Sequence, residues 1–167
     1  DTFAEPLIEQ KELFNLKFAD GITELINKYF PDVYYAGKPR EMYQSIGQFM
    51  RSIDPDVWVK QLKKNYWNLH LMYGKEDFII TDVRQPNEVQ WCRDNGFTLV
   101  RINTPDEIRK QRIIDCGDQF EVQQFYHETE QHINEYTVDY EIDGNCSKEE
   151  LQQKALELYE KLKQEEQ

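Results

Sequence analysis

FIITDVRQPNEVQWCRDNG, at residues 78–96, has the pattern of a buried strand that leads into a helix. The strand is a short apolar run, and the helix would begin near Pro86 and end at Gly96. Asp82 and Arg84 stand where the strand ends. Ligands of open parallel α/β sheets bind outside the carboxyl ends of the strands, so both side chains are candidates for substrate contact. The structural alternative is that Asp82 caps the turn and Arg84 pairs with it.

On both sides of this stretch, runs typical of strands alternate with runs typical of helices. Further strands are expected at residues 13–19, 98–102 and 138–142. Helices are expected at the start of the chain and at residues 22–30, 39–53, 54–74, 104–112, 118–132 and 147–162, with a loop at 32–38. This alternation predicts an α/β protein in which a parallel sheet is flanked by helices on both faces, a three-layer architecture.

The composition limits the function classes. A chain of 167 residues suits one domain, and a net charge of -12 argues against binding to a nucleic-acid polymer or an anionic membrane. No apolar run approaches the roughly 20 residues of a membrane span, and no signal peptide is visible. Three widely spaced cysteines suit reduced thiols. These features predict a cytoplasmic protein, in the host cytoplasm if it is viral.

The helix expected at residues 39–53 has an unusual polar face. Arg40, Gln44, Gly47 and Arg51 share this face, which carries no carboxylate. A glycine in a helix interior costs about 1 kcal/mol relative to alanine, so Gly47 predicts that another group approaches closely. The face is therefore a candidate anion-binding surface, and the alternative is an ordinary solvent face.

A set of short motifs runs in order through nearly the whole chain. The motifs are DT at 1–2, FAD at 18–20, REMYQSIG at 40–47 with Arg51, DVWV at 56–59, TDVRQPNE at 81–88, HETE at 127–130 and DGNCSKEEL at 143–151. Together they resemble the deoxynucleoside monophosphate kinases of bacteriophages, which have the P-loop nucleoside monophosphate kinase fold. The resemblance implies a single kinase-like domain, with an acceptor-binding helical region at about 22–73 and a lid at about 105–134.

The resemblance also bears on the first residues. In that family the phosphate-binding loop ends Gly-Lys-Asp-Thr, so the chain would begin with the last two residues of the loop, Asp1 and Thr2. Both would lie beside Mg²⁺. The sequence contains no Gly-x-x-x-x-Gly-Lys stretch, whose backbone N–H groups and lysine would hold the phosphates of ATP. We therefore expect a segment to precede Asp1.

The resemblance implies roles for polar residues in the acceptor site. Arg40, Gln44 and Arg51 would hold the phosphate and base side of the deoxynucleoside monophosphate. Three carboxylates would contact the sugar or the base edge, or would coordinate magnesium through water. They belong to Asp20, Asp82 and Glu88. Arg84 would reach the acceptor phosphate or the transferred group.

Further residues would serve the ATP side. Arg109 and Arg112 resemble lid arginines that close over the ATP phosphates and exclude water. Asn145 lies in a turn that is similar in position to the loop that touches the adenine. His127 and Glu128 would meet the nucleotide or an arginine.

Other interpretations of these ATP-side residues stay open. Arg109 and Arg112 are also spaced to pair with Asp106 and Asp115 along one helix. The histidines and glutamates at positions 127, 128, 130 and 132 are a weak match to a metal site.

The reaction that the resemblance implies is phosphoryl transfer from ATP to a deoxynucleoside 5′-monophosphate, with Mg²⁺ as cofactor. One alternative is a nucleotide-binding module, a sponge or regulatory subunit without catalysis. Another is a related small-molecule kinase whose acceptor carries a phosphate but no base. The aromatic residues Tyr34, Tyr35 and Trp67 leave a homodimer open as an assembly.

Overall fold

The computed structural model describes residues 2–36, 39–74, 76–115 and 135–165. Contacts within the chain divide it into two compact units. One unit is Leu13–Val83, and the other combines Asp1–Glu12 with Arg84–Gln167.

The described residues of the unit Leu13–Val83 form a pair of parallel strands and three α-helices. Its elements are β1 (Phe14–Leu16), α2 (Asp20–Tyr29), the 3-10 helix η1 (Pro31–Ala36), α3 (Arg40–Ile53), α4 (Val57–Tyr73) and β2 (Phe78–Ile80). The strands β1 and β2 pair in parallel, with Phe14 opposite Phe78. The predicted parallel pairing is confirmed, whereas the loop expected at residues 32–38 contains the 3-10 helix.

The boundaries of these elements differ from the prediction at two places, because carboxylates bind the backbone there. The Asp20 Oδ2 accepts the N–H of Lys17 at 3.0 Å, so α2 begins at Asp20 and β1 is shorter than expected. The Asp54 Oδ1 accepts the N–H of Asp56 at 3.1 Å, and α4 begins only at Val57. At its other end, α4 stops at Gly74 as predicted, where φ is 61°.

Two glycines bring the helices of this unit together. A Cβ on Gly21 would lie 2.9 Å from the ring of Trp58, and one on Gly47 would lie 3.3 Å from Ile22. Gly47 is buried, and its carbonyl accepts the indole N–H of Trp58 at 3.3 Å. The close approach predicted at Gly47 therefore comes from α2 and α4. Helices can approach most closely where a residue has no side chain.

Large apolar side chains of α3 and α4 differ in burial. On α3, the apolar residues Phe49 and Ile53 are 65% and 69% exposed. In α4, Trp58 is buried, whereas Trp67 is 39% exposed. His70 is half-buried, and its ring stacks on Tyr66 with centroids 6.0 Å apart.

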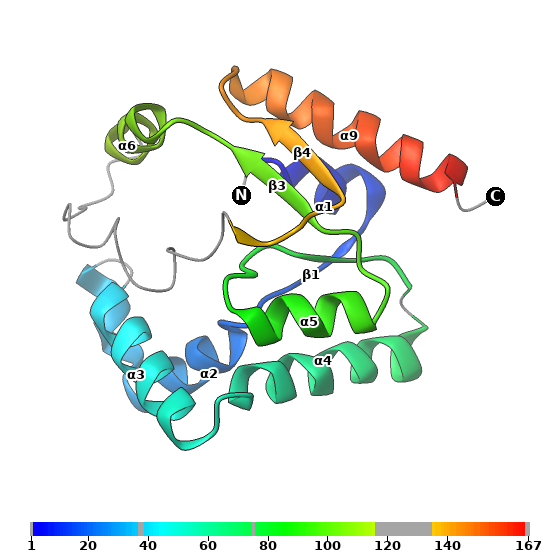
Figure 1. Cartoon of the computed structure of the whole chain (residues 1–167). Coiled ribbons are helices and arrows are strands. Elements are labelled where there is room, and N and C mark those ends of the chain that lie inside the picture. Colours follow the sequence, from blue (N-terminus) through cyan, green and yellow to red (C-terminus); the bar gives the residue numbers. More distant parts are fainter. Residues whose placement is uncertain (1, 37–38, 75, 116–134, 166–167) are drawn as a thin grey trace. The chain divides into compact units, whose positions relative to one another are not determined.

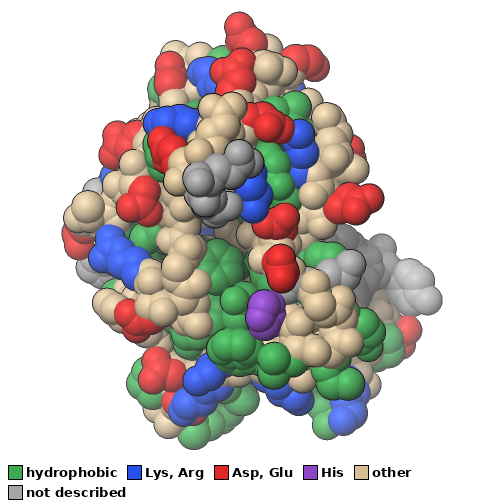
Figure 2. Space-filling view, turned by 90° about the vertical axis from the view of Figure 1, so that its right-hand side faces the viewer, with side chains coloured by type: hydrophobic (Ala, Val, Ile, Leu, Met, Phe, Trp, Pro, Cys, Tyr) green, Lys and Arg blue, Asp and Glu red, His purple; other side chains and the backbone are tan. Residues whose placement is uncertain are grey.

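The end of α4 leaves apolar side chains exposed. The exposed fractions of Leu71, Met72 and Tyr73 are 73%, 74% and 69%. Figure 2 shows a face of the molecule on which hydrophobic side chains gather around a histidine.

The second unit has the same kind of strand pairing. Its elements are α1 (Glu5–Lys11), α5 (Pro86–Asp94), β3 (Val100–Asn103), α6 (Asp106–Asp115), β4 (Tyr140–Asp143) and α9 (Lys148–Glu165). The strands β3 and β4 are parallel, and α1 packs against α9 (Figure 1).

Helix ends in this unit follow the predicted capping signals. α5 starts at Pro86 and is followed by Gly96, where φ is 75°. The Ser147 N–H donates to the Glu150 carboxylate at 2.8 Å, and the Glu150 N–H donates to the Ser147 Oγ at 3.1 Å. This reciprocal capping box opens α9, whose buried residues Leu151, Ala155 and Leu158 share one face.

The described strands form two separate parallel pairs. The α/β class and the parallel pairing agree with the prediction, while the wider three-layer sheet is not shown. The helix expected at residues 118–132 lies outside the described residues.

Candidate functional site

The carboxyl ends of β1 and β2 are joined by Asp82. Its Oδ1 accepts the N–H of Phe18 and its Oδ2 accepts the N–H of Ala19, both at 2.9 Å. Parallel strands bring their carboxyl ends to one edge of a sheet, where ligands bind. The carboxylate of Asp82 thus holds the connection from β1 to α2, and it does so across 64 and 63 residues of chain.

The predicted acceptor residues of α3 are half-buried, namely Arg40, Gln44 and Arg51. The Arg51 Nη1 lies 3.4 Å from the place of a Cβ on Gly47, so this guanidinium also uses the space that the glycine leaves. Beside these residues, the hydroxyls of Thr23 and Tyr43 lie 2.9 Å apart and join α2 to α3. Sequence reasoning missed this pair, because a threonine and a tyrosine twenty residues apart carry no motif.

Glu88 fixes the backbone at the start of α5. It is 2% exposed, and its Oε2 accepts the N–H groups of Arg84 at 2.8 Å and Gln85 at 3.0 Å. The bond from Gln85 is half of a capping box, in which the Glu88 N–H in turn donates to the Gln85 side chain. The Glu88 carboxylate that is predicted to contact a ligand therefore already binds the backbone. The Arg84 side chain is exposed.

Tyr136 is a residue that sequence reasoning did not single out. Its hydroxyl donates to the Arg84 carbonyl at 3.2 Å. Burial raises the pKa of Tyr136 above 10.0, and the carboxylates of Glu88 and Glu135 raise it further. The phenol therefore keeps the proton that it donates to the turn carrying Arg84.

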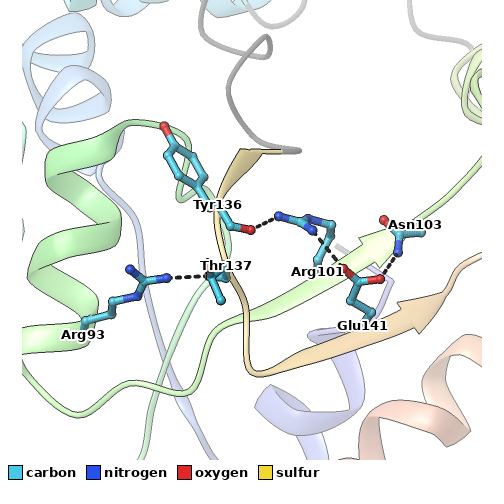
Figure 3. A network of polar contacts seen from close by, with 6 residues as sticks. All are labelled: Arg93, Arg101, Asn103, Tyr136, Thr137 and Glu141. Atoms are coloured by element: carbon cyan, nitrogen blue, oxygen red, sulfur yellow. Dashed lines mark hydrogen bonds and ion pairs between the residues drawn. The ribbon is translucent and has the colours of Figure 1, made fainter.

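A polar network holds the backbone of Tyr136 (Figure 3). The Arg101 guanidinium donates to the Tyr136 carbonyl and forms an ion pair with Glu141 at 2.9 Å. The Arg93 Nη2 donates to the Thr137 carbonyl at 2.5 Å. The segment before β4 is thereby tied to β3 and α5.

The two arginines of α6 have different partners. The Arg109 Nη1 lies 3.3 Å from the Asp106 carboxylate, which is the pairing that the alternative interpretation expected. The Arg112 Nη2 instead donates to the carbonyls of Gly144 at 3.0 Å and Cys146 at 2.7 Å. Arg112 thus holds the turn that contains Asn145, whose own side chain is exposed.

The structure describes only one of the four remaining predicted site residues. Thr2 is half-buried before α1, whereas Asp1, His127 and Glu128 lie outside the described residues. Within the part of the chain that the structure describes, no cluster of three or more His, Cys, Asp or Glu could hold a metal ion. In the same residues, no helix has the length and apolar character needed to cross a membrane.

The predicted residues fall into two groups. Those in the unit Leu13–Val83 are Asp20, Arg40, Gln44, Arg51 and Asp82. The described ones in the other unit are Thr2, Arg84, Glu88, Arg109, Arg112 and Asn145. Asp20 and Asp82 follow the strands β1 and β2, and Asn145 follows β4, whereas Arg40, Gln44 and Arg51 lie on α3, which follows η1.

Comparison with known proteins adds one family. A family model described as deoxynucleotide monophosphate kinase matches residues 5–154. No protein with a curated description matches the chain significantly. The family match confirms the resemblance that the motifs indicate.

Proposed function

The chain belongs to the deoxynucleotide monophosphate kinase family, and on that premise we propose that it transfers the γ-phosphoryl group of ATP to a deoxynucleoside 5′-monophosphate. The products would be ADP and the deoxynucleoside diphosphate. The observation that carries the proposal is the family match, which spans residues 5–154. Phosphoryl transfer requires positioning of two nucleotides and neutralisation of charge more than covalent chemistry.

The acceptor monophosphate would lie on α3. Arg40 and Arg51 present planar guanidinium groups, which match phosphate oxygens in a bidentate geometry. Gln44 lies one helical turn from Arg40 and has both a donor and an acceptor for a base edge. A few local arginines suit an anionic substrate in a chain whose net charge is -12, because the rest of the protein repels it.

Arg84 would neutralise the acceptor phosphate or the transferred group. Its side chain is exposed, while Glu88 and Tyr136 hold its backbone N–H and carbonyl. A fixed backbone limits the positions that the guanidinium can reach, which reduces the entropy lost when it binds phosphate.

The ATP side uses other groups. Arg109 would reach the ATP phosphates in the role of a lid arginine, and Asn145 would lie near the adenine. The magnesium ion would neutralise phosphate oxygens when bound. The Oδ2 of Asp20 holds Lys17, and its other oxygen suits a magnesium contact through water. Asp1, Thr2, His127 and Glu128 keep the roles that the resemblance implies.

The experiment is a measurement of ADP release by the full-length protein, including any residues encoded before Asp1. ATP and Mg²⁺ are combined in turn with each deoxynucleoside monophosphate. Arg40→Ala and Arg84→Ala should each lower kcat/KM about 10- to 100-fold, because each removes a charge-assisted hydrogen bond. Lys64→Ala is the control, since it removes an exposed positive charge from α4.

Two results would contradict the proposal. If no monophosphate is turned over but one still raises the Tm, and Arg40→Ala removes that increase, the protein is a nucleotide-binding module. If every deoxynucleoside monophosphate is ignored in both assays, the acceptor belongs to another class of phosphorylated molecule.

A further inference from the structure

The turn after β4 lies at the edge of the β3–β4 pair where a ligand is expected. Asn103 and Asp143 end the two strands and are register partners. The Gly144 N–H donates to the Asn103 carbonyl at 2.8 Å, so the pairing continues one residue into the turn. Because ligands of parallel sheets bind outside the carboxyl ends of the strands, this turn lies where a ligand of the pair would bind.

The turn has one closely packed conformation. Gly144 is buried, and a Cβ there would lie 2.2 Å from the Thr104 Oγ1. The Asn145 N–H donates to the Asp143 carboxylate at 2.8 Å, and the Lys154 Nζ donates to the Asp143 carbonyl at 2.8 Å. These contacts leave Asn145 exposed at the apex.

Arg112 completes this turn from α6. Its Nη2 donates to the carbonyls of Gly144 and Cys146, the residues on either side of Asn145, at 3.0 and 2.7 Å. Hydrogen bonds from a charged donor are among the stronger ones in proteins. Arg109, one turn earlier on α6, pairs with Asp106 and is exposed, so the two arginines have separate roles.

We propose that Arg112 is a positioning residue that holds the 143–146 turn in shape for the base of the nucleotide donor, and that it does not bind the transferred phosphoryl group. This inference rests on the proposed kinase function. Adenine and guanine differ in the donors and acceptors on their edges, and a rigid polar surface discriminates between them more strongly than a loose one. Arg112 would thus set donor affinity and base selectivity.

The test is steady-state kinetics of the full-length protein with ATP and with GTP as donor, at a saturating deoxynucleoside monophosphate. Arg112→Ala should raise the KM for the preferred donor about tenfold and leave kcat within about twofold. The ratio of kcat/KM for the two donors should move toward one. Arg112→Lys should restore part of both effects, because its ammonium group can still donate to a carbonyl.

Arg109→Ala is the matched control, from the same helix and with the same change of charge. It should leave the ATP-to-GTP ratio unchanged. A fall of kcat in Arg112→Ala without a change in KM or in that ratio would overturn the inference, since it would place Arg112 at the transferred group. The Tm of each variant shows whether it folds, and Arg112→Lys supplies the test if Arg112→Ala does not.

The inference and the proposed function fail in different ways. If wild type releases no ADP, calorimetric titration with Mg-ATP and Mg-GTP replaces kinetics. Weaker and less selective binding by Arg112→Ala would then support the positioning role although the kinase proposal fails. Equal binding by wild type and Arg112→Ala, or no nucleotide binding by wild type, would overturn the inference.

Discussion

Arg101 and Glu141 are register partners in the β3–β4 pair, and an ion pair of 2.9 Å joins the Arg101 Nη1 to the Glu141 Oε1. The two side chains are not equivalent. Arg101 is 13% exposed and also donates to the Tyr136 carbonyl, whereas Glu141 is 58% exposed. The arginine therefore links the strand pair to the segment that carries Tyr136.

Unequal burial predicts unequal effects of mutation. Arg101→Ala should lower the free energy of unfolding by about 1–3 kcal/mol, because it leaves a carbonyl without its charged donor. Glu141→Ala should cost less than about 1 kcal/mol, as expected of an exposed partner. Urea unfolding of both variants and of the double variant measures the values and the coupling between the residues. Equal losses in the two single variants would contradict this account.

Asp82 should be important for stability as well as for any ligand contact. Asp82→Asn keeps one acceptor oxygen but turns an amide NH₂ toward the N–H of Phe18 or Ala19. We expect it to lower the free energy of unfolding by about 1–3 kcal/mol in urea. Asp94→Asn, the same change at an exposed position of α5, should cost less than about 0.5 kcal/mol. If Asp82→Asn lowered the free energy of unfolding no more than Asp94→Asn does, the two backbone hydrogen bonds of Asp82 would contribute little to stability.

Tyr136 predicts a dependence of stability on alkaline pH. Its pKa in the folded protein is raised above 10.0, first by burial and then by the charges of Glu88 and Glu135. The phenol in the unfolded chain therefore loses its proton at a lower pH than in the folded protein. The stabilisation from the protonated phenol is complete below pH 10.0 and is lost as the pH rises through the raised pKa.

The measurement compares urea midpoints of wild type and Tyr136→Phe across this alkaline range. Wild type should lose stability more steeply than Tyr136→Phe, which has no ionisable group at this position. Glu88→Gln should lower the pKa of Tyr136 toward 10.0, because it removes one of the two charges. Parallel curves for wild type and Tyr136→Phe would show that the phenol has the same pKa in both states.

Gly144 should tolerate a methyl group poorly. The new Cβ of Gly144→Ala would lie 2.2 Å from the Thr104 Oγ1 and 2.8 Å from the Ile102 Cγ2, so neighbouring atoms must move. Overpacking of this kind costs about 1–3 kcal/mol. Gly74→Ala is a contrasting control: φ is 61° there and no atom lies within 4 Å, so only backbone strain of about 1–2 kcal/mol is expected.

A double variant tests the cause of the Gly144 effect. Thr104→Ala removes the nearest atom, so Gly144→Ala should cost less in that background than in wild type, as thermal or urea unfolding would show. Additive losses would mean that the hydroxyl of Thr104 is not the obstacle. Since Arg112 binds the same turn, Gly144→Ala should also weaken donor nucleotide binding.

Local signals in the sequence determined much of the secondary structure and the family. Helix ends were predictable, since each depends on hydrogen bonds and sterics within a few residues. Examples are the ends of α4 and α5 before Gly74 and Gly96 and the capping box of Ser147 with Glu150. The order of strands and helices predicted the parallel pairing, and the motifs predicted the family that the comparison shows.

Only the tertiary structure decided the partners of the polar side chains. Asp82 holds the backbone of Phe18 and Ala19, and Arg112 holds the turn beyond β4, at 32 and 34 residues along the chain. Sequence spacing identifies neighbours along one helix or strand, but it does not identify groups that chain folding brings together. The sequence by itself therefore determined the elements and the family, while packing determined which carboxylates and arginines support the backbone, because long-range hydrogen bonds depend on the positions of all the elements at once.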